Sequence, residues 1–354
     1  MGTEELADRL FTAGVATIEL SCVYLGIRLG YYHTLACTGG GLTADELAKH
    51  TGTAPRYTHE WLQSQAISGF VTIDGDDPAT ARYALADGAS DVLVEVTGPA
   101  YLGGLAHAAA AIGGVLPDLA DAYRTGDGLP YARYGADAVT AQAALNRPAY
   151  VNSLAAEWLP QVPDVVDRLA GGARVADYGC GAGWSSIELA RAYPDVRVDG
   201  FDNDEASIAT ARRNAAEQGV ADRIDFEVAD LTGGTGAVGR YDVVFFFECV
   251  HDFPRPVEVL RNARTAVRPG GTVIVMDERA AETFTAPGDP VERFLGGVSA
   301  LWCLPQGLVG ADPQPVGTLM RPAAMAALAA DAGFAASEIL PIEHPFFRFY
   351  RLVP

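Results

Sequence analysis

The chain has 354 residues, of which 49% are hydrophobic, and a formal net charge of −20 at pH 7. This length predicts at least two domains, while the negative charge disfavours nucleic acid and anionic membranes as partners. Five cysteines, none of them in a C-x-x-C pair, indicate neither a zinc site nor a disulfide framework, so a reducing cytoplasm is expected.

Residues 1–95 predict a helical domain with a small hairpin. Residues 43–52 have the Thr and Glu spacing of a capping box and end at a glycine, which predicts a short helix. A second helix over residues 56–69 precedes two strand-like stretches, 70–73 and 83–85, with a turn between them. Helix, helix and hairpin in this order are typical of a winged helix.

The charge of this region argues against DNA binding. Residues 1–90 contain five basic and eleven acidic side chains, and a DNA-binding surface needs the opposite balance. Residues 11–29 are apolar enough to form a helix that is buried either in a dimer interface or in a core. Apolar stretches such as residues 105–116 are shorter than the roughly 20 residues that cross a bilayer, so no membrane-spanning segment is expected.

Residues 96–160 predict a helical linker that contributes a lid over a substrate pocket. The segment is rich in glycine and aromatic residues, and a closing lid excludes water from a reaction. Helices that only connect two domains are the alternative. The candidates for the pocket walls are Tyr101, His107, Tyr134 and Tyr150 from this segment, and Phe294 and Trp302 from later in the chain.

A glycine-rich turn follows a strand that begins near residue 175. Its spacing is Asp177-x-Gly179-x-Gly181-x-Gly183, and a helical pattern comes next. Glycines at alternate positions let backbone amides approach a ligand closely. The spacing differs from the G-x-G-x-x-G that receives a pyrophosphate, and an acid before the turn suits a cofactor with positively charged groups.

Strands and helices alternate after this turn. A strand ends at Asp202, a helix is expected over residues 204–219, and further strands are expected over 224–231, 241–248 and 272–277. Strands separated by helix-length segments predict βαβ units and a parallel sheet, so the predicted fold class is α/β.

These motifs, in this order, resemble class I S-adenosylmethionine (SAM)-dependent methyltransferases of the small-molecule type over roughly residues 150–354. The resemblance implies a Rossmann-like, doubly wound sheet of seven strands, the last antiparallel, in a catalytic domain at 161–354 that uses SAM as its cofactor. In such enzymes a winged helix without a basic face serves dimerisation, so a homodimer that acts on a small molecule is expected. The cofactor-binding candidates are Asp177, Gly179, Gly181, Gly183, Asp202, Asn203, Asp230, Leu231 and Glu248.

The resemblance also assigns roles to some of these residues. Asp202 would hold the ribose hydroxyls, as an acid about 20 residues after a glycine turn does in related folds. Asp230 would accept from the adenine amino group, and Leu231 would cover the face of the ring. Glu248 would hold the methionine end of SAM or an amine of the substrate.

The residues just past the fourth strand carry the catalytic candidates Glu248, His251 and Asp252. By resemblance, His251 removes a proton from an acceptor hydroxyl while that oxygen attacks the methyl group. The unperturbed histidine pKa of about 6.5 leaves a neutral base near pH 7. Asp277 or Glu278, after the fifth strand, would orient the ring. A histidine that only hydrogen-bonds the backbone is the alternative.

Three functions compete at this point. The leading one is O-methylation of a small aromatic metabolite. The second is C- or N-methylation, in which His251 or Glu248 binds or polarises the substrate. The third, a SAM-binding transcriptional regulator, is disfavoured by the acidic winged helix. Some related C-methyltransferases bind a metal at the His–Asp pair with a later histidine, but no histidine lies between Asp252 and Glu343, so no metal is expected.

Overall fold

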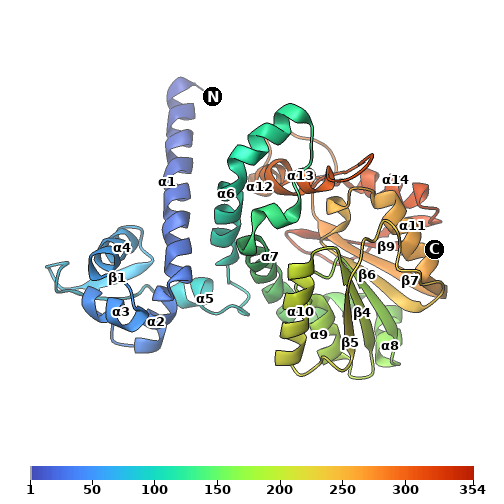
Figure 1. Ribbon diagram of the computed structural model, residues 1–354, viewed down its shortest axis with the longest axis horizontal. Helices are drawn as coiled ribbons and strands as arrows, with labels where there is room; N and C mark the ends of the chain where they lie inside the picture. Colours follow the sequence, from blue (N-terminus) through green and yellow to red (C-terminus); the bar gives the residue numbers. More distant parts are fainter. Residues whose placement is uncertain (1) are drawn as a thin grey trace. The chain divides into compact units, whose positions relative to one another are not determined.

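The computed structural model describes residues 2–354 and divides the chain into two compact units (Figure 1). The first unit comprises Met1–Gly113 and Thr140–Pro148, and the second comprises Gly114–Val139 and Ala149–Pro354. The division falls inside two helices, α6 (Gly104–Thr125) and α7 (Ala136–Ala149). The three-part division at residues 95 and 160 therefore stays a prediction.

The first unit consists of helices and one hairpin. Its helices are α1 (Thr3–Arg28), α2 (Tyr31–Thr38), α3 (Ala44–Thr51), α4 (Pro55–Ile67) and α5 (Ala89–Leu93), and its antiparallel strands are β1 (Val71–Asp74) and β2 (Arg82–Leu85). The expected capping box is present, because the Thr43 amide donates to Glu46 at 2.9 Å and the Glu46 amide donates to Thr43 Oγ1 at 3.3 Å. The order α3, α4 and hairpin agrees with the expected winged helix.

Helix α1 exposes most of its apolar side chains. Only Val23 and Gly26 are buried in it. The exposed large apolar residues are Leu6, Leu10, Phe11, Val15, Ile18 and Leu25. By length and composition, α1 is the one helix of residues 2–354 that could cross a membrane, a criterion that core helices and signal sequences also meet. The sequence analysis expected no membrane-spanning segment, because it considered shorter apolar stretches such as residues 105–116. Helix α1 is longer than these stretches.

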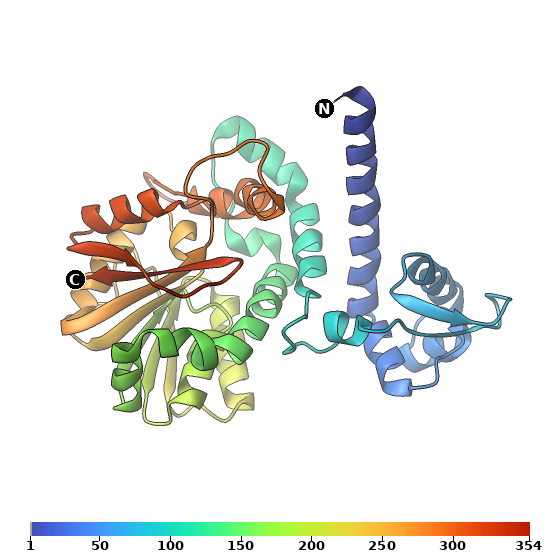
Figure 2. The same cartoon turned by 180° about the vertical axis from the view of Figure 1, so that it is seen from behind.

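The second unit is built on a seven-stranded sheet with the order β5-β4-β3-β6-β7-β9-β8. The strands are β3 (Arg174–Tyr178), β4 (Arg197–Asp202), β5 (Ile224–Val228), β6 (Tyr241–Phe247), β7 (Val267–Glu278), β8 (Ala336–Ile339) and β9 (Phe347–Val353). β9 pairs antiparallel with both β7 and β8, and the other strand pairs of the sheet are parallel, which confirms the predicted topology. Figure 2 shows β8 and β9, the last strands of the chain, at one edge of the sheet. β7 begins at Val267, which is earlier than the predicted strand over residues 272–277. Its pairing with β6 has a register irregularity between Tyr241 and Val243.

Helices cover both faces of this sheet. The longer ones are α8 (Pro163–Ala170), α9 (Trp184–Ala192), α10 (Glu205–Glu217), α11 (Pro256–Ala266), α12 (Pro290–Val298) and α14 (Pro322–Asp331). The shorter ones are η1 (Tyr131–Tyr134), η2 (Tyr150–Trp158), η3 (Leu159–Gln161), η4 (Val250–Asp252), η5 (Ser299–Cys303) and α13 (Leu304–Gly307). α11 and α14 pack on one face, where Val244 and Phe246 are buried. On the other face Phe245 stacks on Phe247, which Tyr150 of η2 contacts.

Candidate active site

The glycine-rich turn lies between β3 and α9 and requires glycine. Gly179, Gly181 and Gly183 all have positive φ, at 75°, 50° and 80°. A Cβ at Gly179 would lie 2.7 Å from the sulfur of Cys249, and one at Gly183 would lie 2.6 Å from the ring of Phe226. Both the conformation and the close packing exclude larger residues. The turn therefore presents backbone at the carboxyl edge of the sheet, as the sequence predicts.

Asp177 is a buried acid that supports the start of α9. Its Oδ2 accepts hydrogen bonds of 2.6 Å from the hydroxyls of both Ser185 and Ser186. Burial raises the pKa of Asp177 to about 6, and the serine hydrogen bonds oppose this rise. Its Oδ1 is buried without a hydrogen-bond partner among the described residues, so one oxygen of this carboxylate is left for a donor or a cation.

Asp202 ends β4, and its carboxylate accepts hydrogen bonds from the backbone of the glycine turn and of the residues that follow β4. Oδ2 accepts from the Gly181 amide and Oδ1 from the Asp204 amide, each at 2.9 Å. Burial raises the pKa of Asp202 to about 6, while these two hydrogen bonds lower it. Asp202 is therefore a carboxylate fixed next to the glycine turn, where the ribose role was predicted.

The other predicted cofactor residues lie past β4 and β5. Asn203 and Asp230 are exposed, and Asp230 Oδ1 accepts from the Thr232 amide at 2.9 Å. Leu231 is 3% exposed and packs in the core between the sheet, α11 and α14. Asp230 is thus available to a ligand, whereas most of the Leu231 side chain is committed to the core.

His251 lies in η4, just past the carboxyl end of β6, and faces the acids that end β7. Its Nδ1 is 2.7 Å from Oδ1 of Asp277. Oε2 of Glu278 is 2.9 Å from the same nitrogen but forms no hydrogen bond. Burial raises the pKa of Asp277, but the charge and hydrogen bond of His251 outweigh this and leave that pKa below its usual value. An ionised Asp277 can only accept, so Nδ1 carries a proton, and Nε2 is the nitrogen that can gain or lose one.

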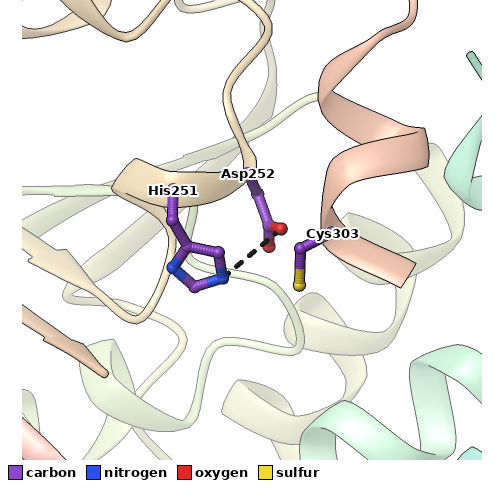
Figure 3. A group of neighbouring side chains, drawn as sticks. All are labelled: His251, Asp252 and Cys303. Atoms are coloured by element: carbon purple, nitrogen blue, oxygen red, sulfur yellow. Dashed lines mark ion pairs between the residues drawn. The ribbon is translucent and has the colours of Figure 1, made fainter. Parts of the chain in front are cut away.

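The surroundings of His251 are strongly acidic. Its side chain is 2% exposed, and its Nε2 is 3.4 Å from Oδ1 of Asp252, which is partly exposed (Figure 3). Burial lowers the pKa of His251, but the carboxylates of Asp277, Glu278 and Asp252 more than compensate and raise it well above the usual value. These carboxylates therefore stabilise the charged imidazolium, in which both ring nitrogens carry a proton.

Glu248 is held in a strained conformation beside this group. Its φ is 58°, a left-handed value that is uncommon for a residue other than glycine. Its Oε2 is buried and has no hydrogen-bond partner among the described residues. Burial raises its pKa to about 7; His251 lowers this value and Asp277 raises it. Glu248 therefore presents a buried oxygen that suits a positively charged ligand group.

Comparison with known proteins places these features in a family. The sequence model of a methyltransferase domain matches residues 169–294. The chain is 36% identical over 119 residues to a 27-O-demethylrifamycin SV methyltransferase from Amycolatopsis mediterranei, an alignment that covers 32% of this chain and 43% of the relative. It is 29% identical over 205 residues to a ubiquinone biosynthesis O-methyltransferase from Bordetella avium, over 57% of this chain and 77% of the relative.

A solved structure extends the likeness to the whole chain. Human N-acetylserotonin methyltransferase in complex with SAM superposes with a TM-score of 0.70 at 18% identity, over 100% of this chain and 99% of that one. At this identity the likeness shows the fold alone, and the match to a methyltransferase domain includes the glycine turn. Together the findings support a class I SAM-dependent methyltransferase, with SAM as its cofactor, as the sequence predicts.

The structure of the methyltransferase brings two predicted wall residues together. The rings of Tyr134 and Trp302 stack with centroids 5.0 Å apart, and the Tyr134 hydroxyl donates to the Leu301 carbonyl at 2.8 Å. This contact joins η1 to η5, the segment next to His251. Tyr150 packs on Phe247 at 5.7 Å, under the same edge of the sheet.

The remaining predicted wall residues are not in this group. Phe294 is 45% exposed on α12. Tyr101 and His107 belong to the first unit, where both are buried and His107 packs against Tyr24 with centroids 5.3 Å apart. Their role in substrate binding stays a prediction.

Two residues that the sequence analysis did not select also lie in the site. Tyr131 of η1 packs against Trp302 at 6.2 Å. Burial raises the pKa of Tyr131, and the carboxylates of Asp202, Asp204 and Asp252 raise it further. Cys303 ends η5 and is buried beside His251 and Asp252 (Figure 3). The only sequence signals were membership of an aromatic-rich segment and a cysteine without a C-x-x-C partner.

Proposed function

We propose that this methyltransferase transfers the SAM methyl group to a hydroxyl of a small aromatic metabolite, with His251 as the general base. The observation that carries this proposal is the 2.7 Å contact between His251 Nδ1 and Asp277 Oδ1, because it fixes the ring with Nε2 free. The O-methyltransferase names of the two relatives, 27-O-demethylrifamycin SV and ubiquinone biosynthesis, agree with an oxygen acceptor.

The reaction balances with these groups alone. The acceptor oxygen forms a bond to the methyl carbon while the sulfur–carbon bond of SAM breaks, and S-adenosylhomocysteine leaves as a neutral thioether. The hydroxyl proton passes to Nε2 of His251, and Asp277 stabilises the imidazolium that results. Most of the remaining rate enhancement comes from aligning the oxygen with the sulfonium and excluding water.

The raised pKa of His251 bears on this step. In the chain alone the four carboxylates of Glu248, Asp252, Asp277 and Glu278 favour a protonated ring, and a protonated ring cannot act as a base. SAM brings two positive groups, the sulfonium and the ammonium, and one carboxylate, so its net charge is positive. These offset the acidic field, so the proposal includes loss of the His251 proton once SAM is bound.

The cofactor roles are part of the same proposal. Asp202 holds the ribose hydroxyls, Asp230 the adenine amino group, and the unpartnered Oε2 of Glu248 the ammonium of the methionine end. The buried Oδ1 of Asp177 adds a second oxygen for positive charge near the glycine turn. A homodimer formed through α1, with its exposed apolar side chains, and a cytoplasmic location complete the proposed picture.

The same Glu248 oxygen supports the second candidate, N-methylation of an amine. A buried carboxylate oxygen without a donor binds a substrate ammonium as readily as that of SAM. Turnover with labelled SAM over phenols, indoles, amines and keto acids, with the labelled product located by NMR, separates these readings. Label on oxygen supports the proposal, and label confined to nitrogen or carbon overturns it.

A further inference from the structure

Three donor atoms converge on the free side of His251 (Figure 3). His251 Nε2 and Asp252 Oδ1 are 3.4 Å apart, and Cys303 Sγ lies within 4.8 Å of both. The first two residues belong to η4 and the cysteine to η5, about fifty positions later. We propose that His251, Asp252 and Cys303 form a binding site for a divalent transition-metal ion.

The spacing of these atoms fits metal ligands. In a tetrahedral site with bonds of about 2.0–2.3 Å, neighbouring ligand atoms are about 3.4 Å apart. The Nε2–Oδ1 separation has this value already. Cys303 Sγ lies within 4.8 Å of both atoms, so the proposal requires that the sulfur move closer to them, by about 1 Å, when the ion binds. Both the histidine and the cysteine are at least 95% buried, so the ion would be shielded from bulk water.

The group around the three donors also has the features of a metal site. A metal-binding histidine usually donates its second ring N–H to a carboxylate, which fixes the tautomer and aims the lone pair at the ion. Asp277 accepts this hydrogen bond from Nδ1 at 2.7 Å. Oδ1 of Asp252 is buried and accepts no hydrogen bond from any described residue. A metal ion would replace the His251 proton as the positive charge beside this oxygen, which is 3.4 Å from Nε2.

The kind of ion follows from the donor set. One imidazole nitrogen, one carboxylate oxygen and one thiolate sulfur match ions of intermediate softness such as Zn²⁺, Co²⁺ and Fe²⁺. Mg²⁺ and Ca²⁺ prefer oxygen ligands alone. Three protein ligands leave a coordination position open, and the thiol proton is released when the ion binds. The sequence predicted no metal, because no second histidine lies between Asp252 and Glu343. The fold instead brings the thiol of Cys303 to His251 and Asp252.

This inference rests on the proposed function in one respect. The lone pair of Nε2 that binds the ion is the one that the proposed general base uses. Ion binding and base catalysis therefore exclude each other at His251. Zn²⁺ should inhibit methylation of a hydroxyl acceptor, and removal of the ion by a chelator should restore the rate.

Binding is tested without reference to activity. The full-length protein, freed of metal by a chelator, is titrated with Co²⁺ and followed by absorption. We expect one ion per chain with a thiolate-to-cobalt charge-transfer band in the near ultraviolet. Cys303→Ser should abolish the band, and Asp277→Asn should weaken Co²⁺ binding by about 10–100-fold while the band at saturation persists.

The matched control is another cysteine beside a histidine. Cys37 Sγ is 3.6 Å from His33 Nε2, and both residues are exposed on α2, so Cys37→Ser removes a surface binder of the same chemistry. This variant should keep the band and the affinity, and thermal melting checks that each variant is folded. A band that survives in Cys303→Ser but is lost in Cys37→Ser overturns the proposal, as does a folded wild type that binds no Co²⁺.

The outcomes for the metal site and for the base are separable. Co²⁺ binding that depends on Cys303, together with Zn²⁺ inhibition, supports both. Binding with stimulation of methylation supports the site and overturns the base, because the ion would then activate the hydroxyl itself. A folded wild type that binds no Co²⁺ but keeps base catalysis overturns the site alone.

Discussion

Nδ1 of His251 lies 2.7 Å from Oδ1 of Asp277, although the two residues are 26 positions apart in the chain. The contact follows from the sheet, because β6 and β7 are parallel neighbours whose carboxyl ends meet at one edge. His251 comes just after β6 and Asp277 near the end of β7, so the fold itself pairs them. The pairing leaves one nitrogen of the ring free for chemistry.

Removal of the imidazole should lower turnover and leave cofactor binding intact. A general base contributes about 10²–10⁴-fold, so His251→Ala should reduce kcat by that factor with a hydroxyl acceptor. Steady-state kinetics measure this, and calorimetry with SAM is the control. A loss of less than tenfold, or one seen mainly as a higher KM, would move the assignment to a positioning role and favour an amine or carbon acceptor.

Asp277→Asn tests the orientation of the ring at nearly constant size. An amide at this position can present its NH₂ to Nδ1, which then carries no proton and leaves Nε2 protonated. We therefore expect a fall in kcat close to that of His251→Ala, with KM for the acceptor little changed. Glu278→Gln is the matched control, because Glu278 lies near the same nitrogen without a hydrogen bond and should cost less. Equal losses of kcat in the two variants would contradict the assignment of Asp277 as the hydrogen-bond acceptor of His251 Nδ1.

The pH dependence should report the acidic surroundings of His251. Burial lowers its pKa, but the nearby carboxylates raise it further, so the ring stays protonated above pH 6.5 in the chain alone. The kcat/KM for SAM reports the enzyme without its cofactor, so it should rise with pH through an apparent pKa above the usual histidine value, and this limb should vanish in His251→Ala. Because the pKa of His251 is higher in the folded state than in the unfolded chain, its protonation stabilises the fold. This stabilisation is fully present below about pH 6.5 and is lost as pH rises through the folded-state pKa. A rate that is flat between pH 6 and 9 would contradict base catalysis.

The sheet and the cofactor turn were predictable because their signals are local. The glycine spacing before α9 and the acid at the end of β4 each depend on neighbouring residues in the chain. The position of Asp277 beside His251 was predictable from the fold, since the ends of parallel strands share an edge. The choice between Asp277 and Glu278 as hydrogen-bond partner was not, because it depends on side-chain geometry within about 1 Å.

The residues that the sequence analysis missed come from outside the sheet. Tyr131 packs against Trp302 of η5 with ring centroids 6.2 Å apart, and Cys303 of η5 lies beside His251. No periodicity or motif links such distant segments, so nothing local indicates which loop folds over the carboxyl edge. The burial of Leu231 could not be predicted for the same reason, because it depends on α11 and α14.

Loss of the Asp202 carboxylate should weaken SAM binding. A hydrogen bond to a charged group contributes about 1.5–3 kcal/mol, so Asp202→Ala should raise the Kd for SAM by about 10–150-fold. Since burial raises the pKa of Asp202 to about 6, SAM affinity of the wild type should also fall as pH drops below that value. Calorimetry measures both. Asp230→Ala is the comparison, since its carboxylate is exposed and should cost less. Unchanged SAM affinity in Asp202→Ala would contradict the ribose role.

Charges on α1 should dissociate the proposed homodimer. Leu10 and Phe11 are each 75% exposed on a helix that buries only Val23 and Gly26, and such side chains lose favourable burial when left in water. A second copy related by two-fold symmetry would cover them. The double variant Leu10→Asp and Phe11→Asp should therefore have the monomer mass by light scattering at micromolar concentration, whereas the wild type has twice that mass.

A control on another helix separates the effect of an interface from that of added charge. Tyr57 is 80% exposed on α4, and Tyr57→Asp should leave the dimer intact. Because α1 also meets the length and composition of a membrane span, flotation with vesicles of neutral lipid tests the rival partner. A monomeric wild type that floats with vesicles, and whose double variant stays in solution, would assign the exposed face of α1 to a lipid surface. A dimer that survives the double variant would place the interface elsewhere in the chain.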